Sequence, residues 1–355
     1  MESFAHPSQE AGVFGLAGST SATGRPNLVT RTGVPVRRTS SRTAKQVALN
    51  LEIAISRMFH LYHGPRPWSD YAGSPIFRTP VFAGAIRATR PAVWCYAERK
   101  MPTGLNEFEA GACHLWYWRV PAQLGRPLGE LERQFLDAAE AERYARFRVA
   151  PAAHLFLASR ILLRTLLSRY WPARPEDWHF AANRWGRPRV AEPAQAAGLH
   201  FNLSHTDGLV ACLVGDREEL GVDTETTRRP MADMAQIAGR FFAAREVAAL
   251  GEVTEVERRE RFFEFWTLKE SYIKARGIGL SLGLSNFAFT IGVGRATIAF
   301  EPGFGDNPAA WDFRQFRVDP EFLIATSVRR RQGEAITVAI RDAAPLMAET
   351  TSRPV

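Results

Sequence analysis

Gly221-Val222-Asp223-Thr224-Glu225 lies between an apolar run at 209–214 and a polar break at 226–230. A short apolar segment bounded in this way predicts a strand, here over 220–224. Side chains alternate between the two faces of a strand, so Asp223 and Glu225 are expected to point to the same side. The strand therefore presents two carboxylates together.

A third carboxylate comes from Phe265-Trp266-Thr267-Leu268-Lys269-Glu270-Ser271-Tyr272-Ile273-Lys274, inside a predicted amphipathic helix over 257–275. Glu270 and Lys274 are four residues apart and share one helix face. Gly277-Ile278-Gly279 is expected to end the helix. We hypothesise that Asp223, Glu225 and Glu270 converge on one hard cation, Mg²⁺, with Lys274 beside it to neutralise phosphate charge.

Simpler interpretations of these residues stay open on the pattern alone. Asp-x-Glu is a weak motif that also fits exposed residues at a strand end, and Glu270 could simply pair with Lys274 or Lys269. Ser204-His205 follows a strand predicted at 199–203 and could contact a phosphate or an amide-bearing ligand, but a structural histidine fits equally.

Other nucleotide and nucleophile motifs do not account for this chain. No Walker loop and no Gly-x-Gly-x-x-Gly follows a predicted strand, and nothing marks an activated nucleophilic serine. Several arginines are candidates either for phosphate contacts or for solvated surface cations. They are Arg143, Arg146, Arg160 and Arg187.

The composition narrows the class of protein. The chain has 355 residues, of which 46% are hydrophobic, enough for two or three domains with a sizeable core. No apolar run approaches the ~20 residues of a membrane helix, and we expect neither a signal peptide nor a membrane partner. The three cysteines are far apart, which argues against disulfides and cysteine zinc sites and leads us to expect a cytoplasmic protein.

The basic charge is unevenly distributed. Residues 1–110 hold 13 Lys and Arg against 7 Asp and Glu, whereas the remainder holds 32 against 30. A nucleic-acid enzyme would carry its basic excess on the folded part, so no nucleic-acid partner is expected. The composition of 1–45 is typical of disorder, and 46–62 could form one short helix. A solvated tail, a transit peptide and a dispensable segment before Met101 are the alternatives for this leader.

The predicted elements indicate an α+β fold. The order strand, helices, strands occurs twice, across about 112–215 and 216–340, which suggests two similar lobes with a ligand cleft between them. We divide the chain into a low-complexity basic extension at 1–110, an N-terminal lobe at 111–216, a C-terminal lobe with the metal site at 217–342, and a loose tail at 343–355. Helices are predicted at 138–147, 155–170, 235–242 and 244–250, a turn at 185–188, and further strands at 114–120, 209–214, 287–291, 297–300, 311–318, 322–326 and 336–339.

Four motifs, by their order and spacing along the chain, resemble those of a known family. They are Phe201-Asn202-Leu203-Ser204-His205-Thr206, Leu220-Gly221-Val222-Asp223-Thr224-Glu225, Arg240-Phe241-Phe242 with Glu246, and Phe265 through Lys274 followed by Gly277-Ile278-Gly279-Leu280. Over about residues 112–340 the chain resembles the 4′-phosphopantetheinyl transferases of the surfactin-synthetase-activating type. Residues 1–110 have no counterpart in that family.

The resemblance implies a fold and a reaction. The fold would be two pseudo-repeated α+β lobes within one chain. We therefore expect a monomer that resembles a dimer internally. The reaction would transfer the phosphopantetheine arm of coenzyme A to a serine of an apo acyl or peptidyl carrier protein, releasing adenosine 3′,5′-bisphosphate. Asp223, Glu225 and Glu270 would hold Mg²⁺ on the pyrophosphate, Glu270 would be the base, directly or through water, and Lys274 would steady the departing phosphate.

The resemblance also implies contacts to the coenzyme. They are Ser204, His205, Arg143 and Arg187, to which we add Lys269. On the adenylate side the chain departs from the family, because Leu155 and Phe156 replace an arginine and a threonine and Glu140 replaces a lysine; Arg160 is the candidate to compensate.

Two other functions and the choice of carrier stay open. A metal-dependent pyrophosphate-ester hydrolase and a non-catalytic coenzyme A-binding protein are the alternatives. Fatty acid, polyketide and nonribosomal peptide carriers are all possible substrates.

Overall fold

The computed structural model of the chain describes residues 108–125, 127–228 and 234–352. The predicted extension at 1–110, with its helix at 46–62, lies almost entirely outside them. The described residues form helices and mainly antiparallel sheets, which confirms the α+β prediction.

The first lobe is built on a four-stranded sheet in the order β11-β1-β5-β4. Strands β1 and β11 are parallel, and the other neighbours are antiparallel. Helices α2, α4 and α8 pack on this lobe around an apolar core that includes the fully buried Leu157, Leu162 and Trp178. The bounds are β1 Ala112–Arg119, β4 His200–Thr206, β5 Leu209–Gly215, β11 Thr337–Asp342, α2 Leu128–Phe135, α3 Ala138–Ala145, α4 Ala150–Leu167 and α8 Ala344–Ser352.

The second lobe is built on a five-stranded antiparallel sheet in the order β6-β10-β9-β8-β7. Helix α7 packs on β6 and β10, and α5 and α6 pack beside it. The bounds are β6 Leu220–Thr226, β7 Phe287–Ile291, β8 Arg295–Phe300, β9 Trp311–Val318, β10 Phe322–Arg329, α5 Met234–Phe241, α6 Ala244–Gly251 and α7 Glu255–Arg276.

Short elements complete the chain. They are a two-stranded hairpin of β2 His179–Ala182 and β3 Pro188–Glu192, and the 3₁₀ turns η2 Pro175–Asp177, η3 Ala194–Ala196, η4 Gly279–Leu282, η5 Leu284–Asn286 and η6 Pro308–Ala310.

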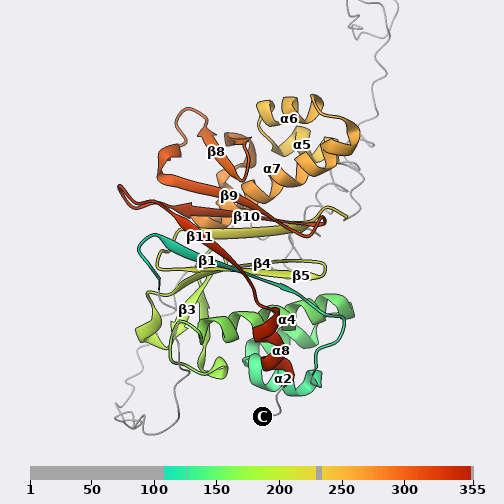
Figure 1. The fold of residues 1–355 in the computed structure, drawn as a ribbon, viewed down its shortest axis with the longest axis vertical. Coiled ribbons are helices and arrows are strands. Elements are labelled where there is room, and N and C mark those ends of the chain that lie inside the picture. Colours follow the sequence, from blue (N-terminus) through green and yellow to red (C-terminus); the bar gives the residue numbers. More distant parts are fainter. Residues whose placement is uncertain (1–107, 126, 229–233, 353–355) are drawn as a thin grey trace, which may run out of the picture. The chain divides into compact units, whose positions relative to one another are not determined.

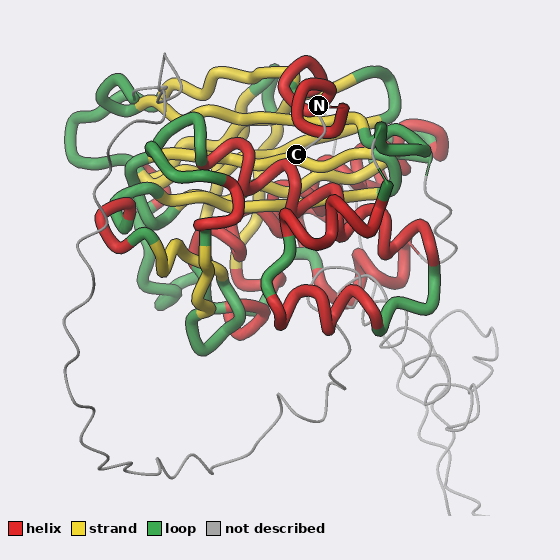
Figure 2. The backbone as a smooth tube through the Cα atoms, turned by 90° about the horizontal axis from the view of Figure 1, so that it is seen from below, coloured by secondary structure: helices red, strands yellow, loops and turns green. Residues whose placement is uncertain are grey.

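A second apolar core joins the two sheets. It combines Leu115 and Leu213 of the first sheet with Val222, Ile324 and others of the second. Figure 1 shows the sheets between the helices of the two lobes, and Figure 2 shows the strands running together from a second side. Strands β4 and β6 lie next to each other at the border between the sheets, and this border positions the site described below.

Helix α7 has a marked start and end. Thr254 accepts a hydrogen bond from the backbone of Glu257, whose carboxylate accepts one from the Thr254 backbone, as in a capping box. Gly277 takes the left-handed conformation, with φ 63°, that stops a helix. These signals fix the ends of the helix that carries Glu270 and Lys274.

Helix α4 is long and apolar enough to cross a membrane by length and composition, and it is the one such helix among the described residues. Most of it is buried inside the protein, and buried leucines such as Leu162 and Leu166 contribute to the first core. The core helix of a compact lobe passes the same test.

The structure differs from the sequence prediction in several places. Helix α2 and the strands β2 and β3 have no counterpart among the predicted elements. The tail expected to be loose after residue 342 contains α8, because Ala343 and Met347 are fully buried in the first core. Strand β4 continues through Ser204-His205-Thr206, where we expected a break. The strand predicted at 336–339 belongs to the first sheet, although it follows the second in sequence.

A buried histidine links β1 to β11 and predicts a pH effect. His114 Nδ1 lies 2.8 Å from the Tyr170 hydroxyl, and its Nε2 lies 3.2 Å from Nη2 of Arg341. Arg341 has only donors, so Nε2 must accept and the ring must be neutral. Burial, with a smaller effect of Arg341, lowers the pKa of His114 to about 4.

Because the unfolded chain takes up a proton near pH 6.5, the stability from neutral His114 is present above that pH and is lost as pH falls towards 4. We expect the free energy of unfolding, measured with urea, to drop by on the order of 2 kcal/mol over this range, and His114→Gln to remove that drop. His179→Gln, at an exposed position, is the matched control. Equal pH slopes for wild type and His114→Gln would contradict the prediction.

Candidate active site at the border of the lobes

Polar side chains of β4 bind the backbone of β6. Asn202 Oδ1 accepts the backbone N–H of Val222 at 2.8 Å, and Ser204 Oγ accepts that of Thr224 at 3.3 Å. Asn202, Ser204 and Thr206 alternate along β4, and all three are buried. The two sheets are thus joined here through side chains, which fixes β4 and β6 relative to each other.

The same border holds the first two predicted carboxylates. Asp223 Oδ1 accepts a hydrogen bond from the Ser204 hydroxyl at 2.9 Å, and Thr206 Oγ1 donates to Glu225 Oε2 at 3.4 Å. Asp223 and Glu225 are both nearly or fully buried. Asp223 and Glu225 lie two positions apart on β6. The residues that bind them, Ser204 and Thr206, lie two positions apart on β4.

Gly221 lets α7 approach this strand. A Cβ at this position would lie 2.1 Å from the carbonyl oxygen of Ser271 and 2.5 Å from the backbone nitrogen of Ala275. Only a residue without a side chain fits between the strand and the helix backbone. The close contact brings the last turns of α7 onto β6.

Replacing Gly221 with alanine is expected to lower the free energy of unfolding by about 3 kcal/mol, because the new methyl group must push α7 away from β6. Thermal or urea unfolding of the full chain measures this. Gly239→Ala on α5 is the matched control, since no atom lies within 4 Å of its Cβ position, and it should be neutral or stabilising. Equal stability of Gly221→Ala and wild type would mean that the helix and the strand are less tightly packed than described.

Glu270 and Lys274 reach the carboxylates from α7. Lys274 Nζ donates to Asp223 Oδ1 at 2.7 Å and to Ser204 Oγ at 2.8 Å. Glu270 is 7% exposed, and its Oε1 is buried without a hydrogen-bond partner, as is Oδ2 of Asp223. The two residues predicted from the helix therefore meet the two predicted from the strand.

The electrostatics reflect this crowding of acids. Burial raises the pKa of Glu270 to about 8, and the negative charges of Asp223 and Glu225 raise it while Lys274 lowers it. Burial also raises the pKa of Asp223, against the opposing effect of Lys274. One lysine does not neutralise these three acids when all are ionised, so an additional cation near them would favour their ionised forms.

The oxygens of this site suit a divalent metal, although the side chains do not already form a coordination shell. Among residues 108–125, 127–228 and 234–352, no group of three or more His, Cys, Asp or Glu side chains is arranged to hold a metal ion. However, two buried carboxylate oxygens, Asp223 Oδ2 and Glu270 Oε1, have no hydrogen-bond partner. Mg²⁺ takes few carboxylates and completes its shell with water and phosphate oxygens, so this donor set suits it.

Lys269 lies elsewhere, contrary to its predicted coenzyme contact. Its fully buried ammonium pairs with Glu246 at 2.7 Å and donates to the carbonyls of Leu284 at 2.8 Å and Phe287 at 2.7 Å. An ammonium group has three donors, and all three are used here. Lys269 therefore anchors α7 to α6 and β7 and is omitted from the proposed site.

Arg143 and Arg160 lie with the helices of the first lobe. Their guanidinium carbons are 5.1 Å and 4.7 Å from the centroid of the Phe156 ring, which is almost completely buried. Arg160 also pairs with Glu140 at 2.7 Å. Phe156, which departs from the family pattern, thus contacts both arginines, and Arg160 is already engaged by an acid.

The remaining predicted coenzyme contacts on β4 are Ser204 and His205. Ser204 lies in the site, but its hydroxyl is bound to Asp223, Lys274 and the Thr224 backbone. His205 is half-buried and is the next residue of β4, so it points to the opposite face. Their coenzyme contacts stay predictions.

Sequence reasoning missed Asn202 and Thr206 as parts of the site. The signal was the alternation Asn202, Ser204, Thr206, which places three polar side chains on one face of a strand. The predicted strand ended at Leu203, so this alternation was not recognised.

Two family models match the part of the chain that forms this site. Residues 130–217 match the model "4'-phosphopantetheinyl transferase, N-terminal", and residues 219–328 match the 4′-phosphopantetheinyl transferase superfamily. The two models meet between Arg217 and Glu219, next to the start of β6. Asp223, Glu225, Glu270 and Lys274 all lie in the second.

Individual relatives agree with these matches. The chain is 34% identical over 166 residues to 4′-phosphopantetheinyl transferase HetI of Nostoc sp., covering 46% of this chain and 69% of the relative. It is 30% identical over 207 residues to 4′-phosphopantetheinyl transferase Sfp of Bacillus subtilis, covering 57% and 88%. A phosphopantetheinyl transferase of Thraustochytrium sp. is 28% identical over 225 residues, covering 60% and 75%. With its carboxylates gathered where the two lobes meet, this chain belongs to the 4′-phosphopantetheinyl transferase superfamily.

Proposed function

We propose that this protein transfers the 4′-phosphopantetheine arm of coenzyme A to a serine of an apo acyl or peptidyl carrier protein. The serine oxygen forms a bond to the β-phosphorus of the coenzyme, the bond from that phosphorus to the bridging oxygen breaks, and adenosine 3′,5′-bisphosphate leaves. This proposal rests on the close approach of the buried acids Asp223, Glu225 and Glu270 to the partly buried Lys274, in a chain of this family.

Glu270 is the candidate to receive the serine proton. Its carboxylate is buried, and the unpartnered Oε1 is not engaged by another side chain. Burial and the two neighbouring acids raise its pKa, which makes the ionised carboxylate a stronger base than one in water. The proton moves from the serine hydroxyl to Glu270, directly or through one water.

Lys274 and Ser204 arrange the other charges. The Lys274 ammonium, held 2.7 Å from Asp223 and 2.8 Å from Ser204, lies where it can neutralise charge on a phosphate oxygen. Ser204 fixes both partners and so keeps the lysine in place. Phosphoryl transfer depends mainly on such positioning and charge neutralisation.

The proposed metal is Mg²⁺. The oxygens of Asp223, Glu225 and Glu270 would hold it, and the two unpartnered oxygens of the site support this assignment. When bound, the ion would neutralise the pyrophosphate and hold its oxygens next to these carboxylates. Residues Arg143 and His205 are proposed as coenzyme contacts, and a cytoplasmic monomer is the proposed state.

The test is modification of apo carrier proteins. The purified full chain, coenzyme A and MgCl₂ should add the mass of the phosphopantetheine arm to at least one apo carrier from fatty acid, polyketide or nonribosomal peptide synthesis, and EDTA should stop the reaction. Adenosine 3′,5′-bisphosphate should form only when the carrier is present. Release of this product without a carrier, or no mass gain on any of the carriers, would refute the proposal.

A further inference from the structure

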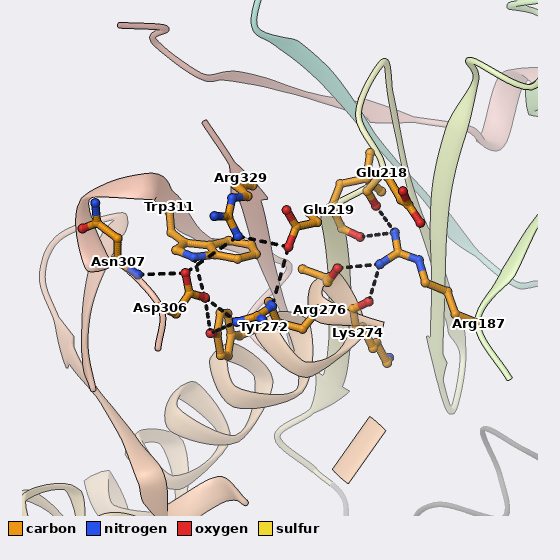
Figure 3. A network of polar contacts seen from close by, with 12 residues as sticks. Arg187, Glu218, Glu219, Tyr272, Lys274, Arg276, Asp306, Asn307, Trp311 and Arg329 are labelled. Carbon is orange, nitrogen blue, oxygen red and sulfur yellow. Dashed lines mark hydrogen bonds and ion pairs between the residues drawn. The ribbon is translucent and has the colours of Figure 1, made fainter. Parts of the chain in front are cut away.

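The turn between β2 and β3 contacts the end of α7. Arg187 Nη1 donates to the carbonyl oxygens of Lys274 at 2.7 Å and Ala275 at 2.6 Å. Its Nη2 donates to the carbonyl oxygen of Leu220 at 3.0 Å and also to that of Glu218. Figure 3 shows this guanidinium between the end of α7 and the segment that leads into β6.

These carbonyls need partners, and an arginine suits them. The last four carbonyls of a helix have no partner within the helix, and a cation at its carboxyl end is favoured by the helix dipole. The planar guanidinium can donate to several acceptors at once, which a lysine cannot do in the same geometry. Asn183 adds a hydrogen bond from Nδ2 to the carbonyl oxygen of Gly277 at 2.9 Å.

The approach of Arg187 is close. A Cβ on Gly277 would lie 2.9 Å from Cδ of Arg187, so the helix end and the arginine stem are packed against each other. Arg187 belongs to the first lobe, whereas α7 and β6 belong to the second. One side chain of the first lobe therefore holds both elements that carry the acids.

The same two elements meet again at the site. The backbone of Lys274 is held by Arg187, and its side chain is held by Asp223. Leu220, the first residue of β6, lies three residues before Asp223 and is held by the other nitrogen of Arg187. Removing the guanidinium would free the carboxyl end of α7 to shift along β6, and Lys274 would move with it.

We propose that Arg187 is a positioning residue for the reaction, which fixes the last turn of α7 against the start of β6, and that it does not act as a contact to coenzyme A. This inference rests on the proposed function. It differs from the sequence prediction, in which Arg187 was a coenzyme contact. Both of its terminal nitrogens are already engaged by backbone carbonyls.

A second network keeps α7 in place without Arg187. Asp306 accepts hydrogen bonds from the Tyr272 hydroxyl at 2.6 Å and from Trp311 Nε1 at 3.1 Å, and it also pairs with Arg276 (Figure 3). Variants of Arg187 should therefore remain folded while the end of the helix becomes less fixed.

The experiment compares Arg187→Met and Arg187→Lys with wild type in the full chain. Arg189→Met, an exposed arginine in the adjoining strand β3, is the control. Three quantities are measured: kcat for carrier modification, coenzyme A affinity by calorimetry, and hydrogen exchange of the backbone amides at 272–277 in the protein alone. For Arg187→Met we expect kcat to fall by about 10- to 100-fold, coenzyme A affinity to change by less than about 3-fold, and exchange at 272–277 to become at least about 10-fold faster.

Arg187→Lys should show the same changes to a smaller degree, since an ammonium group reaches fewer carbonyls. Loss of coenzyme A affinity with unchanged exchange would overturn the inference and restore Arg187 as a coenzyme contact. Unchanged kcat and exchange in both variants would also overturn it. If wild type itself modifies no carrier, the proposed function fails separately, and a catalytic role of Arg187 fails with it, while the exchange data still decide whether Arg187 fixes the helix end.

Discussion

Replacing Glu270 with glutamine is expected to slow carrier modification by about 100-fold or more, while coenzyme A still binds. Glutamine has nearly the same size and can still offer an oxygen, but it cannot take up a proton. The measurement is kcat for the mass gain of an apo carrier at saturating coenzyme A and Mg²⁺, with coenzyme A affinity measured in parallel. The rate should fall much more than the affinity.

The same substitution has an independent effect on stability. Because burial and the neighbouring acids raise the pKa of Glu270 from 4.5 to about 8, the native state holds its proton more strongly than the unfolded chain. Ionising Glu270 therefore destabilises the fold increasingly as pH rises from 4.5 to 8. In metal-free buffer, the free energy of unfolding of Glu270→Gln should therefore fall less than that of wild type as the pH rises from 4.5 to 8.

Glu264→Gln provides the matched control for the transfer rate. Glu264 lies on the same helix, nearly two turns before Glu270, and is partly buried beside Arg261. It should leave the transfer rate within about 2-fold of wild type, as expected for a residue outside the site. Wild-type rates for Glu270→Gln would remove Glu270 from the role of base.

Replacing Glu246 with glutamine is expected to lower the free energy of unfolding by about 3 to 5 kcal/mol. Glu246 and Lys269 form an ion pair of 2.7 Å in which both side chains are fully buried. Glu246 also accepts the backbone N–H groups of Ala243 and Phe289, each at 2.9 Å. The substitution leaves a buried ammonium without its counter-charge, and an amide cannot accept all three hydrogen bonds.

Urea unfolding of the full chain measures this effect. Glu252→Gln, at an exposed position after the end of α6, should change stability by less than about 0.5 kcal/mol. The double variant Glu246→Gln with Lys269→Met should recover part of the loss, because the unpaired charge is gone. A double variant as unstable as the sum of the two single variants would show that the pair does not interact.

Local patterns predicted many of the elements and which side chains of the site share a face, whereas the site as a whole was assigned through the four motifs of the family. The alternation of Asp223 and Glu225 predicted their common face, and the spacing of Glu270 and Lys274 predicted theirs. Both follow from the fixed periods of strand and helix, which are set by the local backbone geometry. Gly277 likewise marked the end of α7 through its backbone freedom.

Long-range contacts could not be predicted in this way. Lys269 and Lys274 are both close to Glu270 in sequence, and only the packing of α6 decides that Lys269 meets Glu246. Arg187 reaches carbonyls about 31 to 88 residues away, for which its own neighbourhood gives no signal. Strand β4 continues through Ser204 because β6 supplies partners for the polar side chains, which a single strand pattern does not reveal.

The return of the chain to its first sheet limits how the protein can be divided. The superfamily match ends at Val328, but Thr337–Asp342 then pairs with β1 and the following helix buries Met347 under the first lobe. A fragment cut at residue 328 would expose the edge of β1 and uncover part of that core. Engineers who exchange lobes between members of this superfamily should therefore treat residues 337–352 as the closing piece of the N-terminal half, and keep them with it.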